Sequence, residues 1–598
     1  MYLGELEYHI VFVRFHNKSN STIKQIPSQE MSNIHHFQNL RRLITVMILF
    51  LSMIDSRDLT AQPYGDYTFY SPKNTSKAYL VDLSGNIYHT WTFSSSARTG
   101  YSSYLLSGGV VLRTVAKSGN YFTGGPICGQ VQKVDWNGNI IWDFVYSTTA
   151  YCTHHDIHPM PNGNVLLIAY ETKTPAQVTQ AGCSQSITMW PDKIVEIEPS
   201  GATGGNVVWE WHAWDHLSQS VNPAKDNYVT SIVGHPELLN INYKTQKDWL
   251  HMNGLDYNET LDQITFSCHN MNELYVIDHS TTTAEAAGHT GGNSGKGGDL
   301  LYRWGNPSAY QAPGTTNFNV IHDAHWVPAD CPRANYLVGF NNKGGPGNKS
   351  CIDFISPPYN GYNYSITPGS AFAPASIDWR HTYSGTPSQN EGNSQQLPNG
   401  NTLITMSLSG YIYEIDSNQN VVWSKTISGS VTNARRYTAC YINNPATPTI
   451  TGIAGVLHSS ASTGNQWFLD GVMISGATGN SLTPMLSGNY QVQVTDLNGC
   501  ASPMSAPYNI TGVATGEIAL AEKLKIFPNP TTGIITLDGA MLTGSDFEIT
   551  VFNATGNIIL RKQHSKVIDL SASGNGIYFL SLKPGSGETI TRKIFVVK

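Results

Sequence analysis

Apolar and polar residues alternate in short runs along most of the chain, and one such run recurs with a tryptophan at its end. The run 81–91 reads Val-Asp-Leu-Ser-Gly-Asn-Ile-Tyr-His-Thr-Trp, 134–142 reads Val-Asp-Trp-Asn-Gly-Asn-Ile-Ile-Trp, and 415–423 reads Ile-Asp-Ser-Asn-Gln-Asn-Val-Val-Trp. Alternation is typical of half-buried strands, and Asn-Gly between strands is typical of a hairpin with a type I′ turn, which needs positive φ at both central positions. The runs predict antiparallel hairpins whose second strand carries a tryptophan.

The tryptophan runs divide the segment from about residue 66 to residue 442 into repeats. They are marked by Trp91, Trp142, Trp209 with Trp211, Trp304, Trp379 and Trp423. A second motif, Pro-Asn-Gly-Asn followed by a strand, occurs at 161–168 and 398–405. Four-stranded units of roughly 45 to 75 residues have the period of propeller blades. The pattern predicts a six-bladed β-propeller, with seven blades as the alternative, whereas a string of β-sandwiches has no reason to repeat one tryptophan position.

Shifts in composition divide this all-β chain into four predicted parts. Residues 1–62 form a leader, 63–444 the propeller, 445–516 an immunoglobulin-like β-sandwich module and 517–598 a small C-terminal β-sandwich. A Pro/Thr-rich linker opens the third part, and an alternating strand at 490–494 is followed by a turn at 496–500. Short alternating strands with such turns are typical of sandwich modules. We expect this module to be a spacer or an accessory binding unit.

The leader carries the features of a secretory signal. Arg41 and Arg42 precede an apolar run from Leu43 to Ile54, and small residues follow at 60–61. A basic flank, about a dozen apolar residues and a small-residue end are typical of a signal peptide. The run is well short of the roughly 20 apolar residues that span a bilayer. We therefore expect an exported protein without an integral membrane anchor, and we expect translation to start at Met31.

Charge and cysteine content narrow the class of protein further. The net charge of −7 leaves no basic footprint for nucleic acid, so we expect no nucleic-acid partner. Eight cysteines in an exported protein are able to pair as disulfides, and none shows the CxxC spacing of a metal site. Cys331 and Cys351, which bracket a Gly- and Asn-rich stretch, are the first pairing that we expect, and Cys128 with Cys152 is the second.

The final segment has four elements that resemble the type A sorting domain of the type IX secretion system. They are Lys-Ile-Phe-Pro-Asn-Pro-Thr-Thr-Gly at 525–533, Val-Phe-Asn-Ala-Thr-Gly at 551–556, Gly-Ile-Tyr-Phe at 576–579 and the terminal Lys-Ile-Phe-Val-Val-Lys at 593–598. They follow one another in the order of that domain. The resemblance implies the secretion machinery as a partner, export across the outer membrane, and release or attachment at the cell surface.

Polar segments that follow the tryptophan strands hold the candidate chemistry. In propellers, sites lie at one mouth of the central channel, on segments contributed by several blades. The segments here are 101–104, 154–158, 251–254, 322–325, 393–396 and 433–437. Several of them deliver histidine, and the last delivers Arg435 and Arg436. A ring of basic and nucleophilic groups is what an anion-transfer site needs.

The order of these motifs resembles the bacterial arylsulfotransferase family, which needs no nucleotide sulfate donor. The matching pieces are His-His-Asp at 154–156 with Pro-Asn-Gly-Asn, 248–253 with Asp256-Tyr257, 267–270 with Leu-Tyr-Val-Ile-Asp at 274–278, and 322–324. The resemblance implies a phenolic sulfate donor, a phenol acceptor, a sulfohistidine intermediate and no cofactor. By position it makes His322 the nucleophile. His155 and His251 would bind sulfuryl oxygens or handle the phenol proton, and Asn253 and His269 would contact the substrate.

One position departs from the family pattern. Cys268 stands where the family has an arginine, immediately before His269. Losing one preorganised charged donor costs on the order of a hundredfold in rate. Arg435 and Arg436 are the residues that we expect to substitute for it at the anion, and the alternative is a relative with another substrate or without activity.

Two plainer interpretations stand beside catalysis. A histidine next to an aspartate on a blade segment is often a structural pair that ties neighbouring blades together. His154, His155, Asp156 and His158 also invite comparison with a metal cluster, although alternate residues of a strand point to opposite faces, and we expect no metal. The alternative function is a surface propeller that binds ligands or glycans without catalysis.

Overall fold

The computed structural model describes residues 62–443, 445–511, 524–539, 542, 546–584 and 589–598. The predicted signal peptide and the start at Met31 lie outside the described residues and stay predictions. No helix among the described residues has the length and apolar character needed to cross a membrane.

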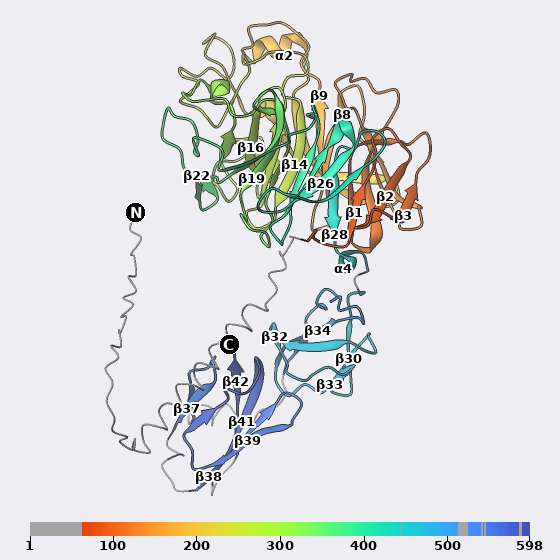
Figure 1. Cartoon of the computed structure of the whole chain (residues 1–598). Coiled ribbons are helices and arrows are strands. Elements are labelled where there is room, and N and C mark those ends of the chain that lie inside the picture. Colours follow the sequence, from red (N-terminus) through yellow and green to blue (C-terminus); the bar gives the residue numbers. More distant parts are fainter. Residues whose placement is uncertain (1–61, 444, 512–523, 540–541, 543–545, 585–588) are drawn as a thin grey trace, which may run out of the picture. The chain divides into compact units, whose positions relative to one another are not determined.

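Six four-stranded antiparallel sheets follow one another between residues 67 and 437 of the described chain, and they form the six predicted blades (Figure 1). Blade 1 holds β1 (Tyr67–Tyr70), β2 (Lys77–Asp82) and β3 (Ile87–Thr92), and blade 2 holds β4 (Thr99–Leu106), β5 (Val110–Ala116), β6 (Gly129–Val134) and β7 (Ile140–Val145). Blade 3 holds β8 (Tyr151–Pro159), β9 (Val165–Glu171), β10 (Asp192–Ser200) and β11 (Gly204–His212).

Blade 4 holds β14 (Met252–Asn258), β15 (Gln263–Cys268), β16 (Glu273–Asp278) and β17 (Tyr302–Trp304). Blade 5 holds β18 (Ile321–Trp326), β19 (Leu337–Gly345), β20 (Lys349–Ile355) and β23 (Trp379–Thr382), and blade 6 holds β24 (Asn393–Gln396), β25 (Thr402–Met406), β26 (Tyr411–Ile415) and β27 (Val421–Thr426). The first strands of successive blades contact one another, so they form the innermost layer.

The propeller closes by pairing its two ends. Strand β28 (Ala434–Tyr437) pairs with β1, with Arg436 opposite Thr68, and becomes the fourth and innermost strand of blade 1. Closure of this kind removes the free sheet edges that an open string of sheets would expose. The segment 433–437 therefore belongs to the first blade.

The repeated tryptophans tie each blade to the next. They lie on the last strand of their blades, and five donate Nε1–H to a backbone carbonyl of the following blade. The pairs are Trp91 to Asp135, Trp142 to Gly204, Trp211 to Gly298, Trp304 to Pro374 and Trp423 to Leu83, at 2.7–3.1 Å. A buried indole needs a partner for its N–H, and this contact repeats around the ring. It explains why one tryptophan position recurs in the sequence.

The hairpins are as predicted, but their turns are not type I′. Gly85 and Gly138 have positive φ, whereas the residues before them do not, and Gln419 takes the same conformation in the third run. In each, the aspartate that precedes the turn accepts the backbone N–H of the asparagine four residues on, at 2.7–2.8 Å. The turns are therefore three-residue loops with one left-handed residue and a bulge.

Short elements occupy the longer connections. They are η1 (Ser107–Gly109), α2 (Pro175–Gln180), η2 (Ala213–Asp215), the pair β12 (Leu217–Ser218) and β13 (Leu239–Asn240), α3 (Thr283–Ala286), η3 (Pro307–Tyr310), the pair β21 (Tyr359–Asn360) and β22 (Asn363–Tyr364), η4 (Ser407–Ser409) and α4 (Ala439–Ile442).

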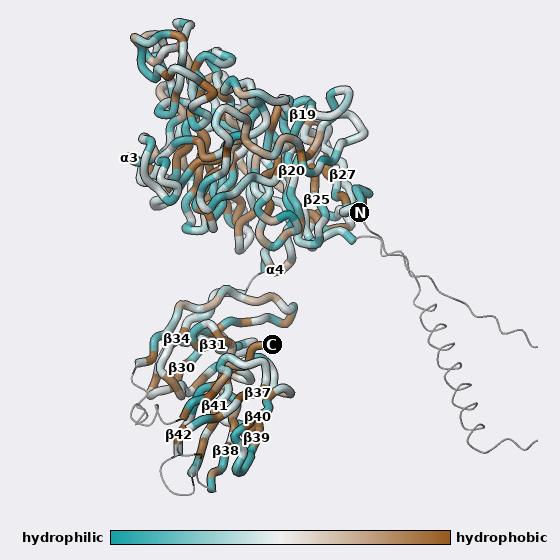
Figure 2. Tube along the Cα trace, turned by 90° about the vertical axis from the view of Figure 1, so that its left-hand side faces the viewer, coloured by the Kyte–Doolittle hydropathy of each residue, from teal (hydrophilic) through white to brown (hydrophobic). Residues whose placement is uncertain are grey.

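Two further pairs of sheets follow the propeller. The first pair holds β29 (Ile450–Ile453), β30 (Val456–Ser459) and β33 (Ser481–Leu482), and β31 (Asn465–Leu469), β32 (Val472–Met473), β34 (Gly488–Val494) and β35 (Tyr508–Ile510). The second holds β36 (Lys525–Phe527), β37 (Ile534–Asp538) and β40 (Val567–Asp569), and β38 (Phe547–Asn553), β39 (Ile558–Gln563), β41 (Gly576–Pro584) and β42 (Ile590–Val596). Figure 2 shows hydrophobic residues inside the propeller and along these strands. The immunoglobulin-like assignment and the domain boundaries stay predictions.

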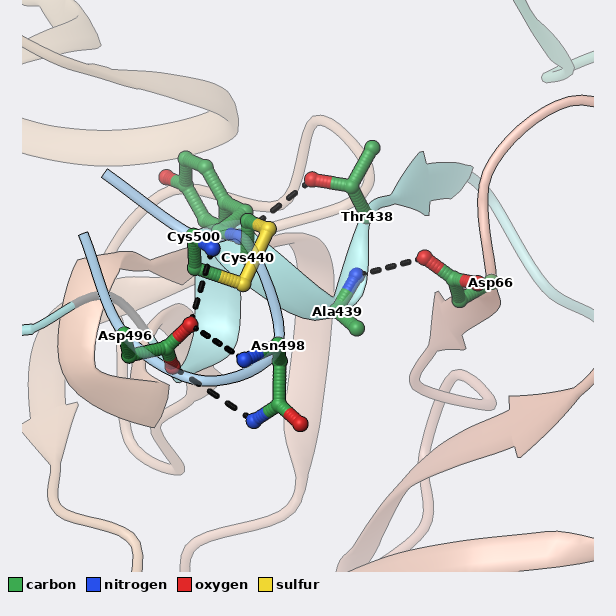
Figure 3. Close-up of a disulfide and its surroundings, with 8 residues drawn as sticks. Asp66, Thr438, Ala439, Cys440, Asp496, Asn498 and Cys500 are labelled. Atoms are coloured by element: carbon green, nitrogen blue, oxygen red, sulfur yellow. Dashed lines mark hydrogen bonds between the residues drawn. A yellow bond between two sulfur atoms is a disulfide. The ribbon is translucent and has the colours of Figure 1, made fainter.

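Both expected disulfides are wrong. Cys128, Cys152, Cys331 and Cys351 are buried free thiols, and the disulfide joins Cys440 to Cys500 (Figure 3). Cys331 Sγ instead contacts Gln396 O at 3.4 Å, and Cys351 Sγ lies 3.4 Å from Thr382 Oγ1. The Gly- and Asn-rich stretch between Cys331 and Cys351 is part of the hairpin of β19 and β20. The two thiols therefore have separate partners and do not meet. The disulfide links α4, just after the closing strand, to the turn after β34.

Candidate functional site

Four innermost strands bulge at corresponding places. The ladder register shifts between Thr99 and Ser103 on β4, Thr153 and Ile157 on β8, Met252 and Gly254 on β14, and His322 and His325 on β18. A bulge bends a strand and re-aims its side chains, and bulges are frequent next to active sites. His155, His251 and Glu391 also have left-handed φ of 48°, 56° and 61°. Such strained backbone clusters at functional sites.

The histidines around these bulges line one cavity. His155, His251, His269 and His322 surround a space of about 870 Å³, which we call the four-histidine cavity. The ring centroids of His155 and His251 lie 4.6 Å apart, those of His251 and His269 5.2 Å, and those of His269 and His322 5.7 Å. The structure therefore brings together the three histidines predicted as catalytic and one predicted to bind substrate.

The other predicted site residues lie elsewhere. Asn253 is buried, donates from Nδ2 to Ile321 O at 2.7 Å and accepts from Ser267 Oγ at 2.6 Å. Arg435 lies over the Tyr104 ring at 3.8 Å, and Arg436 forms a fully buried ion pair with Glu414 at 2.6 Å. None of the three lines the cavity, and the part of Arg435 and Arg436 in anion binding stays a prediction.

The aspartates beside the histidines join blades. Asp156 Oδ2 accepts the N–H of Leu255 in blade 4 at 3.1 Å, and Asp323 Oδ2 accepts the N–H of Ser394 in blade 6 at 2.8 Å. The plainer interpretation of the His-Asp motif thus fits the aspartate, whereas the histidine next to it faces the cavity. His158 pairs with Asp256 at 3.2 Å, so residues 154–158 do not converge on a single metal position.

His322 is held by an amide. Its Nδ1 lies 2.7 Å from Asn342 Oδ1, and Asn342 Nδ2 donates to the carbonyls of Ser388 and Glu391 at 2.8 and 2.7 Å. Those two carbonyls fix the amide orientation, so the side-chain oxygen must accept from Nδ1–H. Nε2 is then the bare nitrogen, and its contact is a long one of 3.3 Å from the Glu391 N–H. Burial and the neighbouring His269 hold the pKa of His322 well below its ordinary value, which keeps the ring neutral.

His155 stands at the end of a buried chain of polar groups. Its Nδ1 lies 2.8 Å from His154 Nδ1, and His154 Nε2 lies 2.7 Å from Asp192 Oδ1, although this second pair is not aligned as a straight hydrogen bond. Burial lowers the pKa of both histidines well below the usual value and raises that of Asp192 well above it. The chain connects the cavity to a buried carboxyl group with high proton affinity.

His251 and His269 differ in their partners. His251 Nδ1 lies 2.7 Å from Asp248 Oδ2, whereas His269 Nδ1 lies 3.0 Å from Asn270 Oδ1. Burial raises the pKa of Asp248, but the hydrogen bond and charge of His251 outweigh this and hold it below the ordinary value. The carboxylate therefore fixes Nδ1–H on His251 and the orientation of its ring, with Nε2 left free.

Two lysines supply fixed positive charge at the cavity. Lys73, from the turn after β1, pairs with Glu391, and Lys247 Nζ lies 4.0 Å from the centroid of the Trp190 ring. Sequence reasoning missed both, together with Asn342 and Asp192, because no local motif connects residues so far apart in the chain. Asp248 alone carried a signal, since it precedes His251 by three residues.

Cys268 is not part of the cavity lining. It is fully buried, and burial raises the pKa of its thiol well above the ordinary value, with the charge of Asp192 adding to the effect. A thiol in such surroundings stays protonated and unreactive. An arginine at position 268 would place a cation beside Asp192, whereas Cys268 supplies none.

Comparisons with known proteins agree with this geometry. The model of the family Arylsulfotransferase (ASST) matches residues 41–358, more than half of the 598-residue chain, and that span contains all four cavity histidines. The model of the secretion system C-terminal sorting domain matches residues 525–597. The predicted export is thereby confirmed, and the protein is secreted to the cell surface.

Individual relatives are more distant. Beta-agarase D of Zobellia galactanivorans is 35% identical over 77 residues, which are 12% of this chain and 15% of the agarase, so the chain spans about 15% of that relative's length. A protein of unknown function from Bacteroides caccae has 10% identity and a TM-score of 0.36, over 62% of this chain and 98% of that one. An inactive virginiamycin B lyase variant from Staphylococcus aureus, with quinupristin, has 10% identity and a TM-score of 0.28, over 75% and 94%. Likeness at these levels carries no argument on function, whereas the family match does: the chain belongs to the arylsulfotransferase family.

Proposed function

We propose that the four-histidine cavity transfers a sulfuryl group from a phenolic sulfate to a phenol through a covalent intermediate on His322. The observation that carries this proposal is the state of His322, a neutral imidazole whose Nδ1–H is fixed by Asn342 and whose Nε2 keeps its lone pair at the cavity. Neutral imidazole is a good nucleophile near neutral pH.

In the first half-reaction, the Nε2 lone pair of His322 attacks sulfur and the bond between sulfur and the phenolic oxygen breaks. The leaving oxygen takes the proton from Nε2 of His251, whose other nitrogen is paired with Asp248. His322 then carries the sulfuryl group on Nε2. The long contact from the Glu391 N–H is given up at this point, which frees that N–H to donate to a sulfuryl oxygen.

In the second half-reaction, the acceptor phenol loses its proton to Nε2 of His155 and its oxygen attacks sulfur. The bond from sulfur to His322 Nε2 breaks, and the lone pair returns to the ring. His155 passes Nδ1–H to His154, and His154 passes Nε2–H to Asp192. After the product leaves, the proton returns along the same chain to His155 and from there to His251, whose ring centroid is 4.6 Å away, which restores the starting state. The pKa directions favour this course, because both histidines are held neutral by burial while Asp192 has raised proton affinity.

Positive charge at the cavity serves the anionic donor. Lys247 and Lys73, the latter paired with Glu391, line the same space as His322 and face the charge of a sulfate ester and of the sulfuryl oxygens in the transition state. Burial lowers the pKa of His269, so this ring contributes a hydrogen bond rather than a charge. These groups take the place that the resemblance assigned to an arginine at position 268.

The experiment that tests this function measures release of 4-nitrophenol from its sulfate with phenol as acceptor. His322→Asn removes the nucleophile and keeps a polar side chain, so we expect at least about a ten-thousandfold loss of turnover. His325→Asn is the matched control, because it lies three residues on along β18 and outside the cavity lining. Equal losses in both variants, or full turnover in His322→Asn, would contradict the proposal. Binding of phenolic sulfates without turnover in the unmutated chain would favour a ligand-binding propeller.

We infer that the type IX secretion machinery is the partner of the C-terminal segment. The support is the sorting-domain match and the compact core of its two sheets, to which Ile535, Ile549 and Leu580 contribute. Deleting residues 521–598 should retain the protein in the periplasm. Normal secretion of the shortened chain would overturn this partner while leaving the sulfuryl transfer unaffected.

A further inference from the structure

A second histidine cluster lies between blades 3 and 4, away from the cavity lining. His216 follows β11 in blade 3, and His289 and Asp299 lie in the connection between β16 and β17 in blade 4. Asp299 Oδ1 is 2.9 Å from His216 Nδ1 and 2.7 Å from His289 Nδ1. One ligand atom from each of the three residues lies within 4.8 Å of the others. We call these three residues the loop cluster.

The two ring nitrogens of His216 have different partners, and Nδ1 is the one that faces Asp299. Its Nε2 lies 2.8 Å from the backbone carbonyl of Ala286, and a carbonyl only accepts, so Nε2 must carry the hydrogen. Nδ1 of the same ring is directed at Asp299 Oδ1, 2.9 Å away, and His216 is fully buried, so the contact is shielded from water. Either a proton or a metal ion satisfies this pair of atoms, and the third ligand atom, from His289, favours the metal.

A histidine that binds a metal has this arrangement. Metal-bound imidazole donates its second N–H to a carbonyl or carboxylate, which fixes the tautomer and the orientation of the ring. Trp211 stacks on the His216 ring at 5.5 Å and holds it in place. A proton is shared between one donor and one acceptor, whereas here three ligand atoms lie within 4.8 Å of one another.

The loop that carries two of the ligands is rich in glycine. Residues 289–299 include Gly291, Gly292, Gly295, Gly297 and Gly298, and the first four have left-handed φ of 58–116°. Glycine loses more conformational freedom on folding than any other residue. Hydrogen bonds hold the loop, among them those from the backbone N–H of Ser294 to Asp278 and from Trp211 to the carbonyl of Gly298. A metal bound at its two ends would add to this stabilisation.

We propose that His216 Nδ1, His289 Nδ1 and the carboxylate of Asp299 bind one zinc-class divalent ion, with water as the remaining ligand. Two imidazoles and a carboxylate suit Zn²⁺ better than Mg²⁺ or Ca²⁺, which prefer all-oxygen sites. Tetrahedral zinc with bonds of about 2.0–2.1 Å places its ligand atoms roughly 3.3 Å apart, so the cluster must open by about half an ångström. The exposed His289 has the freedom to move. The ion would join the end of blade 3 to the outer connection of blade 4, where Trp211 already donates to Gly298.

The test is titration of the untagged full chain with zinc chloride after removal of metals with a chelator. Isothermal titration calorimetry should show one zinc ion bound tightly per chain, and His289→Ala should weaken its affinity by at least about a hundredfold. Adding zinc back to the metal-free protein should raise its melting temperature. His235→Ala is the matched control, because His235 is also partly exposed and faces a single carboxylate, Glu237, at 2.9 Å. The His235→Ala variant should still bind one zinc ion tightly.

His289 is at the surface, so its loss does not threaten the fold, and the cavity histidines stay intact in the variant. Zinc taken up by the cavity would therefore persist when His289 is removed. The proposed zinc site would be overturned if His289→Ala and the unmutated chain bound zinc with the same affinity, or if neither bound zinc tightly. The loop cluster would then be a set of hydrogen-bonded side chains that binds no metal.

Discussion

Four histidines line the propeller cavity and two more meet Asp299 in the loop cluster, and the two groups differ in what the second ring nitrogen contacts. In the cavity each Nδ1 is held by a neighbouring side chain, Asn342, Asp248, Asn270 or His154, so that Nε2 is left for a substrate. In the loop cluster the two Nδ1 atoms converge on a single oxygen.

This difference shows how one residue type serves two chemistries. A histidine held at one nitrogen by a polar partner has a fixed tautomer and one open nitrogen, which is the state of a nucleophile or a proton acceptor. Two histidines that direct the same atom at a shared carboxylate form a ligand set. Within the cavity the partners differ again, since an amide fixes the tautomer of the neutral His322, whereas a carboxylate holds Nδ1 of His251.

Among changes to the partners of these histidines, Asp192→Asn should lower the rate of sulfuryl transfer the most. It removes the proton acceptor at the end of the chain from His155, so transfer to weakly acidic phenols should fall by about a hundredfold. Transfer to nitrophenols, which need little help in losing a proton, should fall much less. Rates for a series of phenols of increasing acidity measure this, and an equal loss for every acceptor would mean that the chain through His154 carries no proton.

A smaller effect should follow from giving His322 the partner type of His251. Asn342→Asp places a carboxylate against Nδ1, which raises the pKa of His322 and lowers the neutral fraction. Activity at pH 7 should fall by about tenfold and recover as the pH rises. The pH dependence of kcat/KM measures this. Asn270→Asp makes the same change beside His269, and it should leave the pH of half-maximal activity unshifted, since His269 is no nucleophile.

The smallest effect concerns a histidine with carboxylates at both nitrogens. His279 lies 2.7 Å from Asp262 and 3.0 Å from Glu196, and although burial lowers its pKa, these two hydrogen bonds raise it to about 9 from 6.5. Because the folded pKa is the higher one, the stabilisation is complete below pH 6.5 and is lost as the pH rises through about 9. Because the Asp262 carboxylate is 36% exposed and solvent screens the pair, we expect a contribution of about 1 kcal/mol.

Denaturant unfolding between pH 6 and pH 9.5 measures that contribution. The unmutated chain should lose unfolding free energy across this window relative to His279→Gln, in which the titrating group is absent. The His235→Gln variant should follow the unmutated chain. Parallel curves for the unmutated chain and His279→Gln would show that His279 is not cationic in the folded state.

Local pattern predicted the parts of the molecule that repeat along the chain. The recurring tryptophan gave six blades, because Trp91 and its counterparts each donate to the next blade. The cavity histidines were found because each lies next to a motif on an innermost strand. Their partners were not, since Asn342, Asp192 and Lys73 reach the cavity from other strands and turns, and only the folded ring brings them there.

The same reason explains where the two arginines lie and why the expected disulfides were wrong. Arg435 and Arg436 follow the last tryptophan in sequence, but closure of the ring pairs their strand with β1, where Arg436 neutralises the buried Glu414. Cys331 and Cys351 bracket one loop, but their thiols contact Gln396 and Thr382 rather than each other. The disulfide joins Cys440 to Cys500 across a sequence separation of 60 residues.

The most direct measurement is the mass of the protein after rapid mixing with an aryl sulfate in the absence of acceptor. The unmutated chain should gain the mass of one sulfuryl group, a peptide map should place it on His322, and added phenol should remove it. His322→Asn should gain nothing. Turnover without any covalent species, or a sulfuryl group on His155, His251 or His269 instead, would contradict the assignment of His322 as the nucleophile.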